Sequence, residues 1–226
     1  MSDTRERILK AAAELLNSEG RDGLSTRAVS AAAGVQPPAL YRLFGDKDGL
    51  LDAVAAYGFD EYLTSKRALG RSDDPVEDLR RGWDLHVEFG LSRPWFYALM
   101  YGEAKPGRTS NAAREADAML RGILMRVAEA GRLRVSVERA ARLVHATGMG
   151  VVLSLIATPP GERDLELAEI ARENVFARIL TDEPMVLDDD LPGRAVALRA
   201  ALGETSVLTD AERGLFTEWL DRIADA

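Results

Sequence analysis

The sequence predicts an all-α protein with a small N-terminal three-helix unit and a larger helical domain. Apolar residues recur at helical spacing along nearly the whole chain, and no convincing strand-like alternation appears. Alanine and leucine dominate a composition with only 6% aromatic residues, which favours helices. Glycine-containing turns divide the first fifty residues into brief helical patterns. We therefore expect one unit at 1–47 and another at 48–226, of which 184–226 is a C-terminal helical extension.

The N-terminal unit is predicted to hold three helices that lead into a longer fourth. Asp3 and Glu6 have the spacing of a capping box at the start of the first helix. Gly20 and Gly23 are expected to end that helix. The following predicted segments are a second helix at 25–33 capped by Ser25, a turn at Gly34–Gln36, a third helix at 37–43 and a fourth that starts near Lys47.

Prolines and one polar linker divide the larger domain. The linker is "TDEPMVLDDDLPG", whose three consecutive aspartates are interpreted as a solvated run. The predicted helix at 136–157 is apolar nearly all round, which predicts burial on every side by a central position or by a partner molecule. The predicted helices of this domain are 75–91, 93–102, 109–130, 136–157, 163–181, 192–202 and 209–224, the last with Thr209 and Glu212 as a capping box.

Composition excludes several classes of protein. The chain has no cysteine, so disulfides, thiolate catalysis and cysteine-based zinc sites are ruled out. Its start lacks an apolar signal core, and its most apolar stretch, 143–158, is shorter than the roughly 20 residues that span a bilayer. We therefore expect a cytoplasmic protein with no membrane partner. The formal net charge is −8, yet residues 1–50 are neutral, which suggests a neutral N-terminal unit beside an acidic body.

The stretch "GVQPPALYRLFGDK" carries the clearest functional signal. Pro37 is expected at the cap of the third helix and Pro38 at its first helical position, where a missing N–H costs nothing. A rigid start of this kind suits the recognition helix of a helix-turn-helix, whose first turn touches base edges in the major groove. The side chains expected to contact double-stranded DNA are Ser25, Thr26, Arg27, Gln36, Pro37, Pro38, Ala39, Tyr41, Arg42 and Lys47.

The stretches "TRERILKAAAELLNSEG" and "GLSTRAVSAAAGVQPPALYRLFGDKDGLLDAVA" resemble the TetR family of ligand-responsive transcriptional regulators. The resemblance implies phosphate contacts at Tyr41 and Lys47 and base contacts at Pro38 and Ala39. It also implies a helical C-terminal domain that dimerises through its last two main helices, 136–157 and 163–181, and holds an inducer cavity. Ala39 and Leu43 depart from the polar residues frequent in the family, so we infer readout through thymine methyls, Gln36, Arg42 and DNA shape.

We therefore expect a transcriptional regulator, in particular a repressor that binds a palindromic operator as a homodimer and is released by a small apolar effector. No cofactor, metal site or catalytic set is expected. The competing hypotheses are a helical hydrolase or dehydratase that uses His86 or His145, and a helical adaptor that binds only protein. Aromatic and methionine side chains suit an adaptable cavity. The effector-binding candidates are Trp83, His86, Phe89, Trp95, Phe96, Met100, Met119, His145 and Met149.

Overall fold

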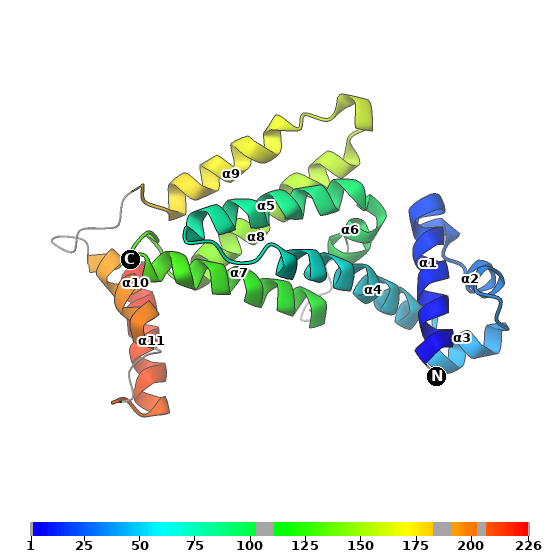
Figure 1. Ribbon diagram of the computed structural model, residues 1–226, viewed down its shortest axis with the longest axis horizontal. Coiled ribbons are helices and arrows are strands. Elements are labelled where there is room, and N and C mark those ends of the chain that lie inside the picture. Colours follow the sequence, from blue (N-terminus) through cyan, green and yellow to red (C-terminus); the bar gives the residue numbers. More distant parts are fainter. Residues whose placement is uncertain (1, 103–110, 183–190, 203–206, 226) are drawn as a thin grey trace.

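The computed structural model describes residues 2–102, 111–182, 191–202 and 207–225, and the regular elements in these ranges are all helices. The predicted all-α fold is therefore confirmed. A small unit of α1, α2 and α3 lies at one end, and α10 and α11 lie at the other (Figure 1). The helices are α1 (Ser2–Gly23), α2 (Thr26–Ala32), α3 (Pro37–Phe44), α4 (Lys47–Ala68), α5 (Pro75–Ser92), α6 (Pro94–Tyr101), α7 (Asn111–Glu129), α8 (Val137–Ala157), α9 (Glu166–Ile179), α10 (Leu191–Ala201) and α11 (Asp210–Ala224), with a 3-10 turn at Pro160–Glu162.

The first helix differs from the expectation at its start. It begins at Ser2, so Asp3 lies inside the first turn, where its charge favours the helix N-terminus but does not cap it. The helix breaks at Gly20, whose φ of 69° belongs to the left-handed region that glycine adopts without strain, and one more turn follows to Gly23. Burial of Ile8, Leu16 and Leu40 joins α1 to α3 in one apolar cluster.

The long helix α4 connects the two parts of the molecule. Near its start, Leu50, Leu51 and Val54 pack into the cluster of the N-terminal unit. Further along, Phe59 and Leu63 are buried against α7 and the end of α6. One continuous helix therefore runs from the N-terminal unit into the larger domain (Figure 1).

The larger domain packs α5, α7 and α8 around its main core, which includes Leu79, Leu124 and Val144. Helix α8 is 21 residues long and apolar enough, by length and composition alone, to cross a membrane, whereas the apolar stretch counted in the sequence is shorter. It packs against α5, α7 and α9 in this fold. The prediction that α8 is buried on every side is wrong for the single chain, because a stripe with Ala146 and Gly150 is exposed.

The C-terminal extension is part of the main core. Helices α10 and α11 pack on each other, and α10 packs on α7. Val196 and Leu220 are buried in the main core cluster. The Asp225 carboxylate accepts hydrogen bonds from the Ser136 backbone N–H and hydroxyl, both at 3.1 Å, which fastens the extension to the start of α8. The predicted capping box of α11 is present at Thr209 and Glu212.

The expected helix bounds differ by a few residues from those observed. The end of the predicted linker belongs to α10, which begins at Leu191. The aspartate run at 188–190 lies outside the described residues.

Candidate nucleic-acid interface and ligand cavities

Helix α3 begins where its two prolines place it, but one residue earlier than expected. Gln36 is the N-cap, in an extended conformation with φ −82° and ψ 144°, and Pro37 is the first helical residue. An extended residue before proline follows from the clash that proline imposes on its predecessor. Gly34 has a φ of 62° in the turn before the helix, and Gly45 has a φ of 82° after it. Both ends of α3 are therefore fixed by the backbone preferences of proline and glycine.

The turn between α2 and α3 is held against the rest of the unit. The Val35 N–H donates to the Ser30 carbonyl at 3.0 Å, and Arg7 Nε of α1 donates to the Ala33 carbonyl at 3.1 Å. Ser25 Oγ caps α2 by accepting from the Ala28 N–H at 3.1 Å. The Asp46 carboxylate caps α4 by accepting from the Gly49 N–H at 2.8 Å. This bonding gives α3 a fixed orientation.

Helix α3 buries one face and leaves the other open. Leu40 is buried, and Phe44 packs partly into the same cluster. Tyr41 is 52% exposed on the outer face, a large value for an aromatic side chain. Among the predicted DNA contacts, the exposed ones are Ser25, Arg27, Gln36, Pro37, Pro38, Tyr41, Arg42 and Lys47, and Thr26 and Ala39 are partly exposed.

A cluster of aromatic and histidine side chains lies in the larger domain between α4, α5, α6 and α8. At its centre, His86 Nδ1 lies 3.1 Å from the Tyr62 hydroxyl, and His86 Nε2 lies 2.8 Å from the Tyr97 hydroxyl. The Tyr101 ring contacts the rings of His86 and His145. Both ring nitrogens of His86 are therefore engaged by phenols.

The charge state of this cluster follows from its burial. Burial, helped by the nearby charges of Lys66 and His145, lowers the pKa of His86 to about 3. Burial also lowers the pKa of His145, with a smaller opposing effect of Asp117. Burial raises the pKa of Tyr97 far above its ordinary value. Near neutral pH, His86 is therefore an uncharged imidazole, and one tyrosine donates to it while the other accepts.

A small inner chamber of about 40 Å³ adjoins this cluster. Such a volume holds a few water molecules at most. Lys66 is one of its lining residues, and its ammonium lies over the Tyr62 ring at 5.1 Å from the centroid, within cation–π range. Burial lowers the pKa of Lys66 to about 8.

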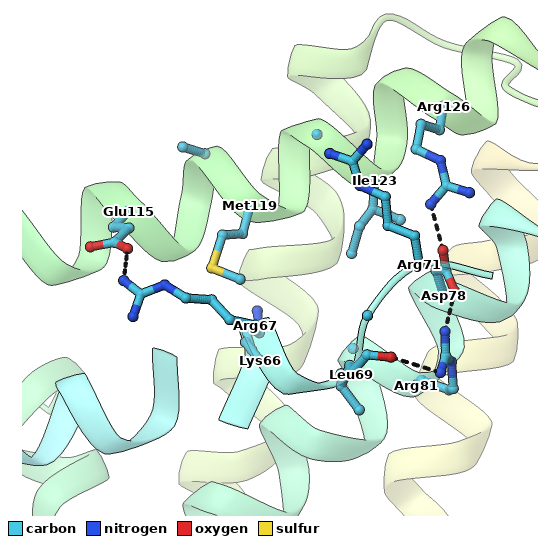
Figure 2. A pocket seen from close by; sticks show the side chains of 14 residues that line it. Lys66, Arg67, Leu69, Arg71, Asp78, Arg81, Glu115, Met119, Ile123 and Arg126 are labelled. Carbon is cyan, nitrogen blue, oxygen red and sulfur yellow. Dashed lines mark hydrogen bonds and ion pairs between the residues drawn. The ribbon is translucent and has the colours of Figure 1, made fainter. Parts of the chain in front are cut away.

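Next to the chamber, a groove of about 480 Å³ runs between the end of α4, the start of α5 and α7 (Figure 2). Asp78 is buried at its edge and binds Arg81, Arg126 and the Ser72 backbone N–H. Burial alone would raise the pKa of Asp78, but the hydrogen bonds from Ser72, Arg126 and Arg81 hold that pKa well below its usual range. The carboxylate therefore stays ionised and joins α5 to α7 and to the loop after α4.

The predicted effector-binding residues do not gather in one site. Trp83, His86 and His145 line the inner chamber, and Met119 lines the groove. Phe89, Met100 and Met119 pack in the apolar cluster around Phe59, and Met149 lies partly exposed on α8.

Trp95 and Phe96 line neither cavity. Phe96 is buried in the cluster of the N-terminal unit, with its ring so close to α4 that a Cβ added at Gly58 would lie 2.2 Å from Phe96 Cδ1. A Cβ at Gly20 would meet the Trp95 ring at 3.0 Å. Both side chains therefore join α6 to the N-terminal unit.

Sequence reasoning missed Tyr62 and Lys66, because a tyrosine or lysine on a helix surface has no local signature of a cavity. The aromatic run of α6 did suggest a cavity lining, but Tyr97 and Tyr101 were not among the residues chosen from it. Within the described ranges, no group of three or more histidine, aspartate and glutamate side chains is placed to hold a metal ion.

The chain is similar to known proteins in sequence over its N-terminal part and in fold over most of its length. Residues 8–54 match the family model described as bacterial regulatory proteins, tetR family. The class C tetracycline repressor protein of Escherichia coli is 51% identical over 51 residues, which is 23% of each chain. This chain therefore aligns with less than a quarter of that relative.

Solved structures with a similar fold cover most of the chain. A TetR family transcriptional regulator, PfmR, from Thermus thermophilus has a TM-score of 0.54 at 26% identity, covering 76% of this chain and 92% of its own. A TetR transcription regulator from Haloarcula marismortui has a TM-score of 0.61 at 21% identity, covering 80% and 100%. The similarity in fold extends far beyond the segment with sequence similarity.

Proposed function

We propose that this chain, whose residues 8–54 match the family model of TetR bacterial regulatory proteins, is a DNA-binding transcriptional regulator that acts as a repressor. In this proposal, a homodimer binds a palindromic operator, and a small molecule held in the larger domain releases it. The observation that carries the proposal is the polar outer face of α3, which the prolines orient and Leu40 anchors. The protein would act in the cytoplasm, where such soluble regulators meet DNA.

The outer face of α3 has the chemistry needed to bind in the major groove of DNA. The Tyr41 hydroxyl and Arg42 of α3, together with Lys47 at the start of α4, are exposed donors at positions suited to phosphate oxygens. Pro38 and Ala39 present apolar surface at the first turn, which suits thymine methyl groups. We infer that phosphate contacts supply most of the affinity and that apolar contacts and DNA shape supply the selectivity.

Dimerisation is supported by the exposed apolar surface of α8 and α9. Leu165 is 61% exposed and Ile170 53% exposed, and Leu143 and Leu167 are also exposed. On α8, Ala146 and Gly150 form a small-residue stripe beside them, and a Cβ at Gly150 would meet nothing within 4 Å. A four-helix interface of α8 and α9 from two copies would cover this surface, in keeping with the twofold symmetry of most homodimers.

Coupling between ligand and DNA would pass through α4. Its first turn is capped by Asp46 directly after α3, and its last turn carries Lys66, which lines both cavities. A molecule that binds better to one position of α4 would shift the spacing of the two α3 helices in the dimer. The expected coupling free energy is typically about 1–3 kcal/mol, and it acts equally in both directions.

The enzyme hypothesis has weaker support. Both ring nitrogens of His86 are engaged by tyrosine hydroxyls, so neither is available as a general base without breaking one of these bonds. The TetR-family relatives are regulators. A pure protein adaptor would have no use for the exposed donors of α3.

The test is selection of bound fragments from random double-stranded DNA, followed by gel shifts at rising salt. We expect a palindromic site whose binding weakens steeply with salt. Lys47→Ala removes one phosphate contact from each subunit of the dimer and should lower the slope of log affinity against log salt by about two, whereas charge-matched Arg194→Ala on α10 should not change it.

Tyr41→Ala should also weaken the shift, and Tyr57→Ala, which removes a partly exposed tyrosine of α4, serves as its control. Wild-type binding by both Tyr41→Ala and Lys47→Ala would refute the assignment of these contacts.

For the dimer, Ile170→Asp should give a monomer in sedimentation analysis. A dimer that persists in this variant would refute the proposed interface.

A further inference from the structure

The groove between α4, α5 and α7 has a charge opposite to that of the whole chain. The chain carries a formal net charge of −8. The groove lining has five basic side chains and two acidic ones, so its formal charge is 5 − 2 = +3. These charged residues come from the three elements and the turn after α4 (Figure 2): Lys66, Arg67, Arg71, Asp78, Arg81, Glu115 and Arg126.

Carboxylates inside the groove neutralise only part of this charge. Arg67 pairs with Glu115 on the exposed side. Arg81 and Arg126 share the single carboxylate of Asp78. Among the described residues, Arg71 and Lys66 have no carboxylate within ion-pair distance. The excess charge is therefore carried by Lys66, Arg71 and the Arg81–Arg126 pair.

Helix geometry explains only some of these cations. Lys66 and Arg67 lie in the last turn of α4, where positive charge favours the C-terminal end of a helix. Arg71 follows the end of α4, Arg81 belongs to α5 and Arg126 belongs to α7. Their convergence on one groove needs another explanation, since like charges gathered from separate elements repel one another.

The remaining lining of the groove is apolar and open. Leu69, Met119 and Ile123 supply the apolar side chains. A Cβ at Gly122 would meet nothing within 4 Å, and one at Gly82 would have Ile123 Cδ1 at 3.8 Å as its nearest neighbour. Lys66, Gly82 and Ile123 also line the inner aromatic chamber, so the two spaces adjoin.

We propose that this groove binds an amphipathic organic anion, a molecule with a carboxylate or phosphate group on an apolar body. The charged group lies near Lys66, Arg71 and Arg81, and the apolar body lies along Met119 and Ile123 toward the aromatic chamber. Guanidinium groups match the oxygens of carboxylates and phosphates in shape and charge. As the identity of the effector, this proposal rests on the proposed function, and it adds a negative charge to the apolar effector that the sequence leads us to expect.

The first experiment measures binding by isothermal titration calorimetry on the full chain without DNA. The probes are octyl phosphate, octanoate, neutral octyl glucoside and inorganic phosphate, each below its micelle concentration. We expect at least one octyl anion to bind at least about tenfold more tightly than octyl glucoside or inorganic phosphate, because charged hydrogen bonds and apolar contact both contribute. The two octyl anions distinguish a phosphate ligand from a carboxylate ligand. Equal binding of octyl glucoside, or no binding of either octyl anion, would overturn the proposal.

Variants locate the site. Arg71→Gln, an exposed position, and Lys66→Met should each weaken binding of the preferred octyl anion at least about tenfold. Arg194→Gln makes the same charge change on an exposed part of α10 and should leave binding unchanged. Gly82→Leu should block the groove sterically while α5 gains a better helix former. Thermal melts by circular dichroism establish that each variant is folded. Wild-type affinity in Arg71→Gln and Gly82→Leu would overturn the assignment.

Failure of the groove assignment can be distinguished from failure of the proposed function. Specific DNA retention by the wild type, together with no binding of any octyl probe, would overturn the groove assignment and leave the regulator intact. Binding of an octyl anion without any effect on DNA retention would support the groove and contradict release by an effector.

Discussion

Phe96 should stabilise the contact between the N-terminal unit and the larger domain. Its side chain is only 1% exposed, and its ring rests on the α4 backbone at Gly58 within the cluster that includes Ile8 and Leu40. Phe96→Ala removes the ring and leaves a cavity between α1, α4 and α6. Replacing a fully buried phenylalanine in this way costs about 3–5 kcal/mol. For a chain of this size, that loss corresponds to a fall in Tm of roughly 6–20 °C.

The assay is urea unfolding followed by circular dichroism, with a thermal melt beside it. Trp95→Ala is the matched control, because Trp95 is the neighbouring aromatic residue of α6 but is 47% exposed. It should lose less than half as much unfolding free energy as Phe96→Ala. A loss below about 1 kcal/mol for Phe96→Ala, or an equal loss for both variants, would contradict Phe96 as the main contact between the N-terminal unit and the larger domain.

Substitutions at His86, Asp78 and two glycines test the packing of the larger domain. Because His86 binds protons less readily when folded, the unfolding free energy should fall as pH is lowered from about 6.5 to 5, and urea titrations that give the same slope for His86→Gln would contradict this. Asp78→Asn leaves two guanidinium groups without their shared carboxylate, so it should cost roughly 3–5 kcal/mol in urea unfolding; a cost below 1 kcal/mol would rule out the ion-paired role. Gly90→Ala should destabilise the fold by about 1–3 kcal/mol, because the new Cβ would lie 2.1 Å from Val152 Cγ1. Gly122→Ala is the control: its Cβ would enter open space, so thermal melts should show a slight stabilisation. The reverse order of stabilities would disprove the close packing at Gly90.

The fold class and helix α3 could be predicted from sequence because their signals are local. Helical periodicity defines α1 to α4, and a proline pair with flanking glycines defines where α3 begins and ends. The outward position of Tyr41 follows from the burial of Leu40 beside it on the same short helix. The one-residue shift of the cap to Gln36 reflects how weakly sequence defines a helix terminus.

The cavities could not be predicted in this way. The Tyr62–His86–Tyr97 bonds join α4, α5 and α6, and the Asp78 ion pairs join α5 and α7. The local sequence pattern indicates which face of each helix is apolar, but it does not indicate which helices pack against each other. For the same reason, the aromatic run in α6 suggested a cavity lining, whereas Phe96 packs on the N-terminal unit.

By itself, the sequence determined the helical class, the proline-led helix with its exposed donors, and the absence of cysteine chemistry. Only the tertiary structure decided that α6 joins the two parts, that the C-terminal helices complete the main core, and that cations from three elements converge on one groove in an acidic chain. The physical reason is range: backbone preferences act within a few residues, whereas burial and charge depend on neighbours that only folding brings together.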